Sequence, residues 1–443
     1  MTGRLLSTPI EAGSREQGRR AATSWRDTPF LGIPLVCFLI VAVLFEPEAV
    51  TQLRPQIHRL YQLGGYVVVF LGGLVILRGR GIPRGLPFFC ALMASAVVST
   101  ALAQGGTLQL VGISDLVQAG VRGMLACALV ARELEGPHRH GFLQGASAYF
   151  ELLALANLAT VLLWPQGLWQ TAYTHEPCFL LGHKNAILPA LMPGVMLVSM
   201  RSIDERGTLD GRTILHLCAI LASVVLAGSA TSAVGAALLL AMALASARSS
   251  VRMPVGPAAL LALGLALTYG LAVLHVQELF APFIEGALNR STDLSARAYI
   301  WERAGGLIAA HPLLGNGELA TVTMRARLGA FNAHNAYLNT LLCGGWARMA
   351  IYLGGALVLG WRLRHRAGAH LHNMVVAVLA IYTVTGLFEV VVGGMPFMAS
   401  MTCCACCDCL SRGGDRRGEA SHGAAASCGV RDARLLTQGE EAR

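Results

Sequence analysis

The sequence predicts an all-α fold, a polytopic membrane helical bundle of about 11–12 spans. Of its 443 residues, 54% are hydrophobic and only 13% are charged, whereas a soluble domain carries about 25% charged residues. Apolar runs of about twenty residues recur along the chain, which is the length that a helix needs to cross a bilayer. A bilayer is therefore the expected solvent for most of the chain.

The expected spans are the apolar runs that lie between polar or glycine- and proline-containing connections. They cover residues 29–46, 60–77, 86–104, 108–131, 141–164, 185–200, 213–229, 231–247, 255–275, 335–361 and 371–392. A further run, 393–410, is a poor candidate for a last span. The first run follows a basic tail and lacks a clear cleavage site, so we interpret it as a span rather than a cleaved signal peptide.

These spans divide the chain into five parts. The parts are a disordered cytoplasmic tail at 1–28, membrane spans one to nine at 29–275, an extracytoplasmic loop with short helices at 276–334, the last spans at 335–410, and a polar tail at 411–443. Five of the cysteines crowd residues 403–409 without a zinc-finger spacing, so no metal site is expected there. Cysteines inside the spans are expected to be small core residues.

Arginine predicts the orientation of the bundle. Arginines precede the first span and then recur in alternate connections, at Arg78, Arg80, Arg84, Arg132, Arg139, Arg201, Arg206, Arg212, Arg248, Arg252, Arg362, Arg364 and Arg366. The positive-inside rule then places the N-terminus in the cytoplasm and residues 276–334 on the outer side. The net charge of +9 comes largely from this inner face and does not indicate nucleic-acid binding.

The longest polar interval, residues 291–346, contains two helix starts. Ser291, Thr292 and Asp293 are each able to cap a helix that places Arg297 and Trp301 on one face. His311-Pro312 is expected to end that helix, because proline lacks a backbone donor and restricts the residue before it. The run from Leu313 to Gly317 is typical of a turn, and a second apolar helix is expected to begin after His334-Asn335.

The pattern of residues in this polar interval resembles that of the family of O-antigen ligases and O-antigen and exopolysaccharide polymerases of bacterial membranes. The resemblance is carried by Arg297 with Trp301, by the HPLLGNG run, and by His334-Asn335 followed by Tyr337, Leu338 and a glycine pair. It covers roughly residues 180 to 350. The remainder agrees only in being a multi-span membrane chain.

A second candidate site lies before the sixth span, in the run Gly182-His183-Lys184-Asn185. Lys184 is the only lysine, among 34 lysines and arginines. A compact ammonium differs chemically from a guanidinium, so we expect this position to need lysine. The alternative is a lysine that only snorkels to the interface. Family members of the exopolysaccharide-polymerase type carry a similar Gly-x-Lys-Asn, which adds His183 and Asn185 to the expected substrate-binding residues.

Other charged residues in or beside spans complete the expected substrate site. Arg122 in the fourth span either pairs with Asp115 two turns away or binds a lipid phosphate. Glu389 ends an outward span, where an ion pair with an arginine is favoured over a role in orienting the acceptor. Arg303 and Asn335 are the remaining expected substrate-binding residues.

These groups favour a metal-independent glycosyl transfer without a cofactor. Cations at a membrane surface suit a diphosphate, which arginine grips through two donors. No acidic cluster typical of a magnesium or calcium site occurs on the expected outer side. His334 is the expected general base, since the unperturbed pKa of histidine lies near neutrality. Its alternatives are a donor to the diphosphate and a helix cap.

The resemblance implies an inverting enzyme of the bacterial inner membrane whose active face is periplasmic. Its donor would be an undecaprenyl-diphosphate-linked oligosaccharide, and its partners the lipid bilayer and other polysaccharide-assembly membrane proteins. Polymerisation of repeat units is favoured over ligation of glycan to lipid A core or protein, because ligase-like relatives place an arginine near Ser232 and this chain has none. A lipid-glycan transporter is a third hypothesis, for which inverted repeats and broken helices would be expected.

Overall fold

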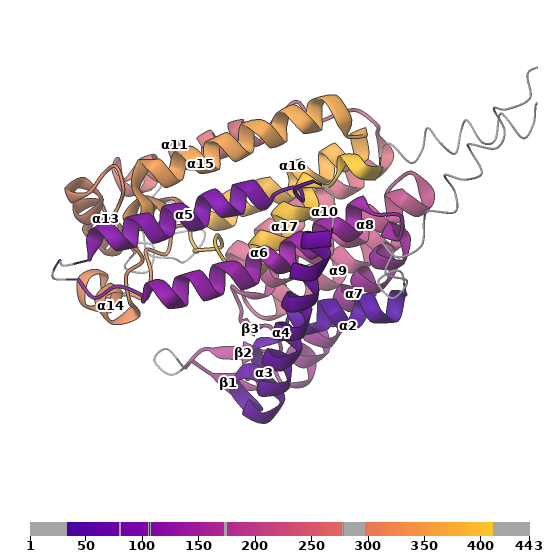
Figure 1. Cartoon of the computed structure of the whole chain (residues 1–443), viewed down its shortest axis with the longest axis horizontal. Coiled ribbons are helices and arrows are strands. Elements are labelled where there is room, and N and C mark those ends of the chain that lie inside the picture. The colour runs from indigo at the N-terminus through magenta and orange to yellow at the C-terminus, as the bar shows by residue number, and fades with distance from the viewer. Residues whose placement is uncertain are drawn as a thin grey trace, which may run out of the picture.

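The computed structural model describes residues 33–78, 81–104, 106, 108–171, 175–276, 278 and 297–410, which form a predominantly helical bundle (Figure 1). The helices are α2 Pro34–Leu44, α3 Glu48–Leu53, α4 Pro55–Arg78, α5 Leu86–Ala103, α6 Ile113–Glu135, α7 Arg139–Leu163, α8 Ile187–Arg206, α9 Gly211–Leu226, α10 Ala230–Arg248, α11 Pro257–Ala272, α13 Arg297–Ala310, α14 Thr321–Leu328, α15 Ala336–Arg366, α16 Ala369–Gly386 and α17 Met395–Ala405. The predicted tails 1–28 and 411–443 and the cap at 291–293 lie outside the described residues.

Within the described residues, seven helices are long and apolar enough to cross a membrane: α5, α6, α7, α8, α10, α15 and α16. Shorter apolar helices are α2, α9, α11 and the segment Met395–Leu410 that contains α17. Each predicted span contains one of these helices or α4. The prediction for the fourth span is wrong at its start, because α6 begins at Ile113 and residues 110–111 instead bond to 318–319 as extended chain.

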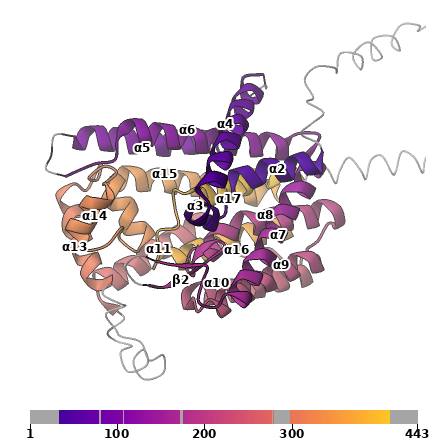
Figure 2. The same ribbon diagram turned by 90° about the horizontal axis from the view of Figure 1, so that it is seen from below.

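The core of the bundle is built around α8 and α16, the two most buried of the long helices. Helix α8 packs against α7, α9, α16 and α17, and Ile187, Leu188 and Leu191 on it are fully buried. A helix that is apolar all round is stable only when other helices surround it. By contrast, α4 packs only on α2, α3 and α6 and stands out from the other helices in Figure 2.

A small antiparallel sheet in the connection from α7 to α8 is a minor addition to the predominantly helical fold. Its strands, β1 Trp169–Gln170, β2 Pro177–Phe179 and β3 Gly182–His183, lie in the order β1-β2-β3. Gly182, the first residue of β3, has a φ of +98°. A Cβ atom at this position would collide with the Glu48 carboxylate. Glycine is therefore required here both for the backbone angle and for the approach of α3.

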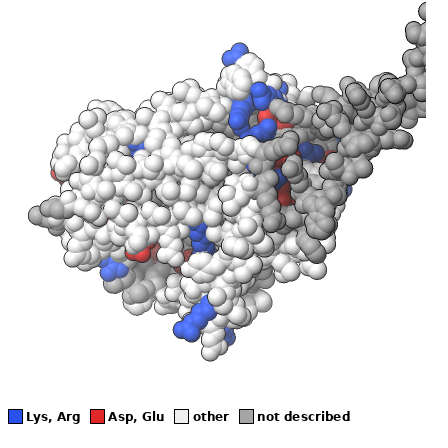
Figure 3. Space-filling model, viewed as in Figure 1, with Lys and Arg blue, Asp and Glu red and all other residues white. Residues whose placement is uncertain are grey.

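The arginine-rich connections meet at one end of the bundle, as their alternation predicts. Arg84 before α5 bonds to Asp408 after α17 at 2.6 Å, and Arg139 at the start of α7 pairs with Asp204 of α8 at 2.8 Å. Arg252 before α11 donates to the carbonyl of Ala367 at 2.6 Å. Elsewhere the surface is largely uncharged, and Figure 3 shows one such face. This pattern is typical of a bundle whose sides face lipid.

Helix α15 is broken at Gly345, where φ is +60° and ψ is −165°. The loop 311–317 fills the break: Asn316 and Gly317 donate to the carbonyls of Leu342 and Cys343 at 2.8 and 3.1 Å. In the other direction, the N–H groups of residues 346 and 347 donate to the carbonyls of residues 312 and 313 at 2.9 and 3.0 Å. The HPLLGNG run and the glycine pair therefore form one structural unit.

The poor final candidate span contains helix α17, which packs on α6 and α8. Cys403, Cys404 and Cys406 are fully buried there, so these thiols fill space in the core. The expectation that the cysteines in the spans are core residues is wrong for Cys90 and Cys218, which are exposed. Both lie on helix faces that the other helices leave uncovered.

Candidate functional site

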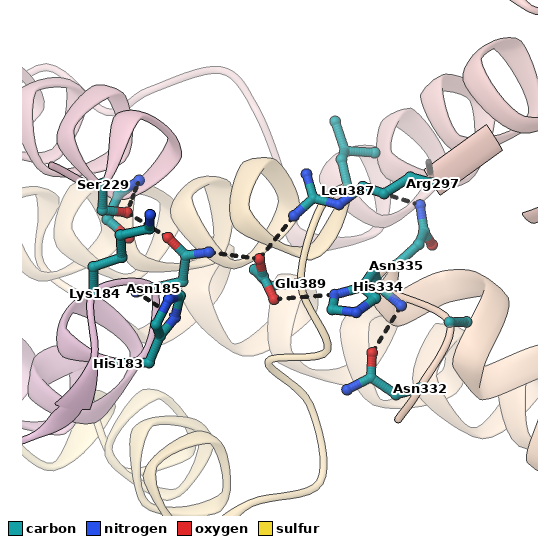
Figure 4. Close-up of polar contacts among 12 residues, drawn as sticks. His183, Lys184, Asn185, Ser229, Arg297, Asn332, His334, Asn335, Leu387 and Glu389 are labelled. Atoms are coloured by element: carbon teal, nitrogen blue, oxygen red, sulfur yellow. Dashed lines mark hydrogen bonds and ion pairs between the residues drawn. The ribbon is translucent and has the colours of Figure 1, made fainter. Parts of the chain in front are cut away.

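Glu389 is the centre of a polar cluster between several helix ends (Figure 4). It follows the C-terminus of α16, where its N–H donates to the carbonyl of Thr385 at 2.9 Å. Its Oε1 accepts from Nδ2 of Asn185 at 2.8 Å and from a guanidinium nitrogen of Arg297 at 3.0 Å. Its Oε2 lies 3.7 Å from Nδ1 of His334. The sequence predicted an arginine partner for Glu389, and Arg297 is that partner.

Arg297 is oriented by the helix that carries it. One turn further along α13, Trp301 is 1% exposed and donates from Nε1 to the carbonyl of Ala333 at 3.0 Å. Trp301 thus fixes α13 against the residue that precedes His334, while Arg297 on the same face points to Glu389. The guanidinium also lies over the ring of Phe388, at 5.7 Å from its centroid. As predicted, α13 ends directly before His311.

His334 has an unusual backbone conformation, with a φ of +45°. Its N–H donates to Oδ1 of Asn332 at 2.8 Å, and its side chain is 32% exposed. Nδ1 is buried and has no hydrogen-bond partner among the described residues, although it faces the Glu389 carboxylate. A non-glycine residue with positive φ carries a conformational cost of about 1–3 kcal/mol and is typical of functional sites.

Asn185 connects Glu389 to α10. The hydroxyl of Ser229 donates to Oδ1 of Asn185 at 2.7 Å, which directs Nδ2 of Asn185 towards Glu389. Ser229 also caps α10, since its hydroxyl accepts from the N–H of Ser232. Ser229 therefore both caps α10 and orients Asn185 in the cluster.

A second cluster surrounds Lys184, where the sequence predicts His183 and Lys184 but not their partner Glu176. The Glu176 carboxylate accepts from Nζ of Lys184 at 2.6 Å and lies 2.6 Å from Nε2 of His183. Burial raises the pKa of Glu176, but the bonds to Lys184 and His183 outweigh it, so the net pKa is below its ordinary value. The sequence signal for this ion pair is that Glu176 precedes the only lysine by eight residues within one short connection.

Asn335 has a structural role instead of the expected contact with substrate. It is fully buried, and its Oδ1 accepts from the N–H groups of Tyr337 and Leu338 as the N-cap of α15. Its Nδ2 donates to the hydroxyl of Thr268 at 3.2 Å and to the carbonyl of Leu387 at 3.0 Å. An asparagine side chain makes about four hydrogen bonds, so no capacity remains for a ligand. The cap considered for His334 is therefore made by its neighbour.

Two further predicted site residues lie apart from this cluster. Arg303 donates to the carbonyl of Arg327 at 3.2 Å and stacks on Tyr299. Arg122 lies in α6 against the ring of Tyr66, 5.8 Å from its centroid. No ion pair joins it to Asp115, although both are among the described residues. Two helical turns separate that pair by about 10 Å along the axis, which is too far for contact.

The two clusters together place two carboxylates among an arginine, a lysine and two histidines. Glu389 occupies one guanidinium nitrogen of Arg297, and a guanidinium has five donors in all. The ammonium of Lys184 likewise has three donors, of which Glu176 takes one. Each of these cations therefore has hydrogen-bond donors beyond the one that its carboxylate takes. Within the described residues, no three His, Cys, Asp or Glu side chains are placed to hold a metal ion.

No protein-family model matches this chain, and no curated protein matches it in sequence. What the chain does therefore has to be inferred from the chemistry of these side chains.

Proposed function

We propose that this chain is a membrane glycosyltransferase of the O-antigen ligase and polysaccharide polymerase type. It transfers an oligosaccharide from an undecaprenyl-diphosphate carrier and joins repeat units into an exopolysaccharide or O-antigen. Supporting this is the cluster at Glu389, which unites residues up to 204 positions apart in the sequence. An arginine, a histidine and an amide converge there on one partly exposed carboxylate, which is an arrangement able to bind and orient a substrate.

The proposed topology has about 11–12 spans in the bacterial inner membrane, with a cytoplasmic N-terminus. The gathering of the arginine-rich connections at one end of the bundle supports it. Figures 1 and 2 place α13 and α14 at the far end of α5, α6 and α15 from those connections. Residues 276–334 are then the extracytoplasmic loop, and the Glu389 cluster faces the periplasm.

The proposed reaction is a direct displacement at the anomeric carbon of the donor. An acceptor hydroxyl oxygen forms the new glycosidic bond while the bond from that carbon to the diphosphate oxygen breaks. The electron pair leaves with the lipid diphosphate, and the hydroxyl proton passes to Nε2 of His334. Glu389, which faces Nδ1, holds the ring and stabilises the imidazolium that forms. Configuration is inverted because only one displacement takes place.

The cations act on the leaving group. Arg297 donates through its remaining guanidinium nitrogens, and Lys184 with His183 contacts the second phosphate. The carboxylates of Glu389 and Glu176 keep these side chains in place before the donor arrives. Such preorganised charge lowers the barrier because the groups do not need to rearrange during the reaction.

The broken helix α15 bears on the transporter hypothesis. In transporters, broken helices expose backbone groups that bind the cargo. Here the carbonyls of Leu342 and Cys343 already accept bonds from the loop 311–317, so this break supplies structure and not a binding site. The enzyme is the better supported proposal, and ligation of finished glycan remains the alternative reaction for the same cluster.

The proposal is tested with purified protein and lipid-linked repeat units in detergent, with polymer length measured on gels. Arg297→Ala should abolish polymer while the protein still inserts, and Arg297→Lys should recover little, because an ammonium lacks the two-pronged contact. Arg327→Ala, at the exposed end of the neighbouring α14, is the matched control and should keep full activity. Normal polymer from Arg297→Ala would refute the assignment.

Chelation and acceptor choice complete this test. Wild-type activity should persist in EDTA, and its loss would refute the metal-independent mechanism. Supplying lipid A core as acceptor distinguishes the alternatives: transfer to core without growth of the repeat-unit chain would identify a ligase. If neither product forms, but lipid-linked glycan crosses a vesicle membrane, the transporter hypothesis is correct.

A further inference from the structure

A cavity of about 480 Å³ lies between α5, α11, α15, α16 and α17. No residue of the Glu389 or Glu176 clusters lines it. Its walls are mostly apolar and aromatic side chains, among them Phe88, Tyr352 and Phe397. Its volume lies within the range of about 300–1,000 Å³ that is typical of ligand sites.

The two ends of this cavity differ in polarity. One end is lined by Gly85, Arg362 and Ala405, which belong to the arginine-rich end of the bundle. The other end reaches Tyr337 and Thr383, nearer to the Glu389 cluster. Arg362 is the one charged residue among the described residues that line this mostly apolar cavity.

Arg362 has no carboxylate partner among the described ion pairs. Its guanidinium makes one long hydrogen bond, of 3.4 Å, to the carbonyl of Ala405. An arginine near the end of a spanning helix reaches the headgroup region, where phosphate is the available anion. The other donors of the guanidinium are suited to that phosphate.

The cavity is too large to be an ordinary packing defect. Protein interiors have few voids larger than a water molecule, whereas this one is far larger and partly open to the surroundings of the helices. Apolar cavities of this kind stay dry and take up apolar molecules. Hydrocarbon from the surrounding bilayer is the apolar material in contact with these helices.

We propose that this cavity binds one phospholipid of the leaflet at the arginine-rich end, with an acyl chain inside and the phosphate on Arg362. Under the proposed function, a polyprenyl diphosphate would place its headgroup at Arg297 and Lys184, at the opposite end of the bundle. It would then leave Arg362, in the last turns of α15, without an anion. The bound phospholipid fills the cavity that α5, α11, α15, α16 and α17 enclose.

Gly354 allows a direct test, since it lines the cavity and a Cβ atom there would meet no heavy atom within 4 Å. Gly354→Leu should therefore fold and place its side chain where the acyl chain lies. The matched control is Gly73→Leu in α4, where a Cβ atom also meets nothing within 4 Å and the cavity is absent. Full-length proteins are purified in neutral detergent, and retained phospholipid is counted by mass spectrometry of the intact complexes.

Wild type and Gly73→Leu should retain about one phospholipid per chain, and Gly354→Leu should lose most of it. After delipidation, added phosphatidylglycerol should raise the thermal midpoint of wild type and of Gly73→Leu but not that of Gly354→Leu. Arg362→Gln leaves the cavity open and should weaken binding of this lipid about tenfold, the effect of one charge-assisted hydrogen bond. Equal retention in Gly354→Leu and wild type overturns the proposal, as does recovery of a polyprenyl diphosphate in place of the phospholipid.

Discussion

Replacement of Glu389 by glutamine separates the chemical role of this carboxylate from its structural one. Glutamine has nearly the same shape and still accepts a bond from Nδ2 of Asn185. It lacks the negative charge that faces Nδ1 of His334 and the guanidinium of Arg297. We therefore expect Glu389→Gln to fold and to transfer glycan slowly.

The magnitude follows from the distance. Opposite unit charges 3.7 Å apart attract by about 4 kcal/mol at an effective dielectric constant of about 20. The side chains of His334 and Glu389 are 32% and 21% exposed, so water screens much of this attraction and roughly 1.4 kcal/mol is a realistic share. If the imidazolium forms only in the transition state, the turnover number should fall about tenfold.

Steady-state kinetics with lipid-linked donor distinguishes this explanation from simple loss of structure. Glu389→Gln should lower kcat while the KM for donor stays equal or falls, because Arg297 is released to bind the diphosphate. Arg297→Ala should instead raise that KM. Glu302→Gln, on the exposed face of α13, is the matched control. An unchanged kcat in Glu389→Gln, or a loss that only follows the amount of folded protein, would refute the reasoning.

The other predictions concern Lys184, Glu176 and Gly345. Lys184→Arg should lose most activity although it keeps the charge, and full activity in that variant would reduce the lysine to a snorkelling residue. The pKa of Glu176 in the folded protein is lower than the ordinary carboxyl value of 4.5. Its bonds to Lys184 and His183 therefore stabilise the small sheet fully at pH values above 4.5, and this stabilisation is lost as the pH falls through the lower, folded-state pKa. Amine labelling of Lys184, the only lysine, should therefore increase in Glu176→Gln at neutral pH; identical labelling would contradict the ion pair. Gly345→Ala should lower the free energy of unfolding by about 1–3 kcal/mol or more, because alanine is strained at the backbone angles of this position. Gly354→Ala on the same helix should raise it by roughly 0.5–1 kcal/mol. Equal thermal midpoints for the two variants would contradict the helix break at Gly345.

The sequence predicts most of the helices because a spanning helix is encoded by composition over a window of about twenty residues. It also predicts that Glu389 finds an arginine, since a carboxylate in an apolar run needs a partner. It does not predict which arginine, because Arg297 is 92 positions away and no local pattern encodes that distance.

Local chemistry also explains the errors. The sequence places Asn335 directly after His334, where a contact with substrate is expected, yet an asparagine before an apolar run is equally a helix N-cap. Glu176 was overlooked because strands of two or three residues leave no periodicity to recognise. Only the antiparallel pairing of Cys178 with His183 brings Glu176 to Lys184.

The residues that carry the family resemblance divide into two groups with different tasks. Arg297 and His334 have partly exposed side chains that face one carboxylate, so they are the residues able to meet a substrate. Trp301 and Asn335 are buried and make bonds that hold the first group: Trp301 to the carbonyl before His334, and Asn335 to the carbonyl two residues before Glu389.

The position of His334 is therefore set from both sides of its own peptide. Trp301 bonds Ala333, the residue before His334, to α13, and Asn335, the residue after His334, bonds through its own side chain to the end of α16. The Gly345 break and its loop in turn anchor the first turns of α15 that follow. Because these bonds fix the backbone on both sides, His334 can keep its positive φ, and its ring stays beside Glu389. A histidine held in this way is suited to accept a proton from a bound hydroxyl, since little rearrangement of the ring is then required.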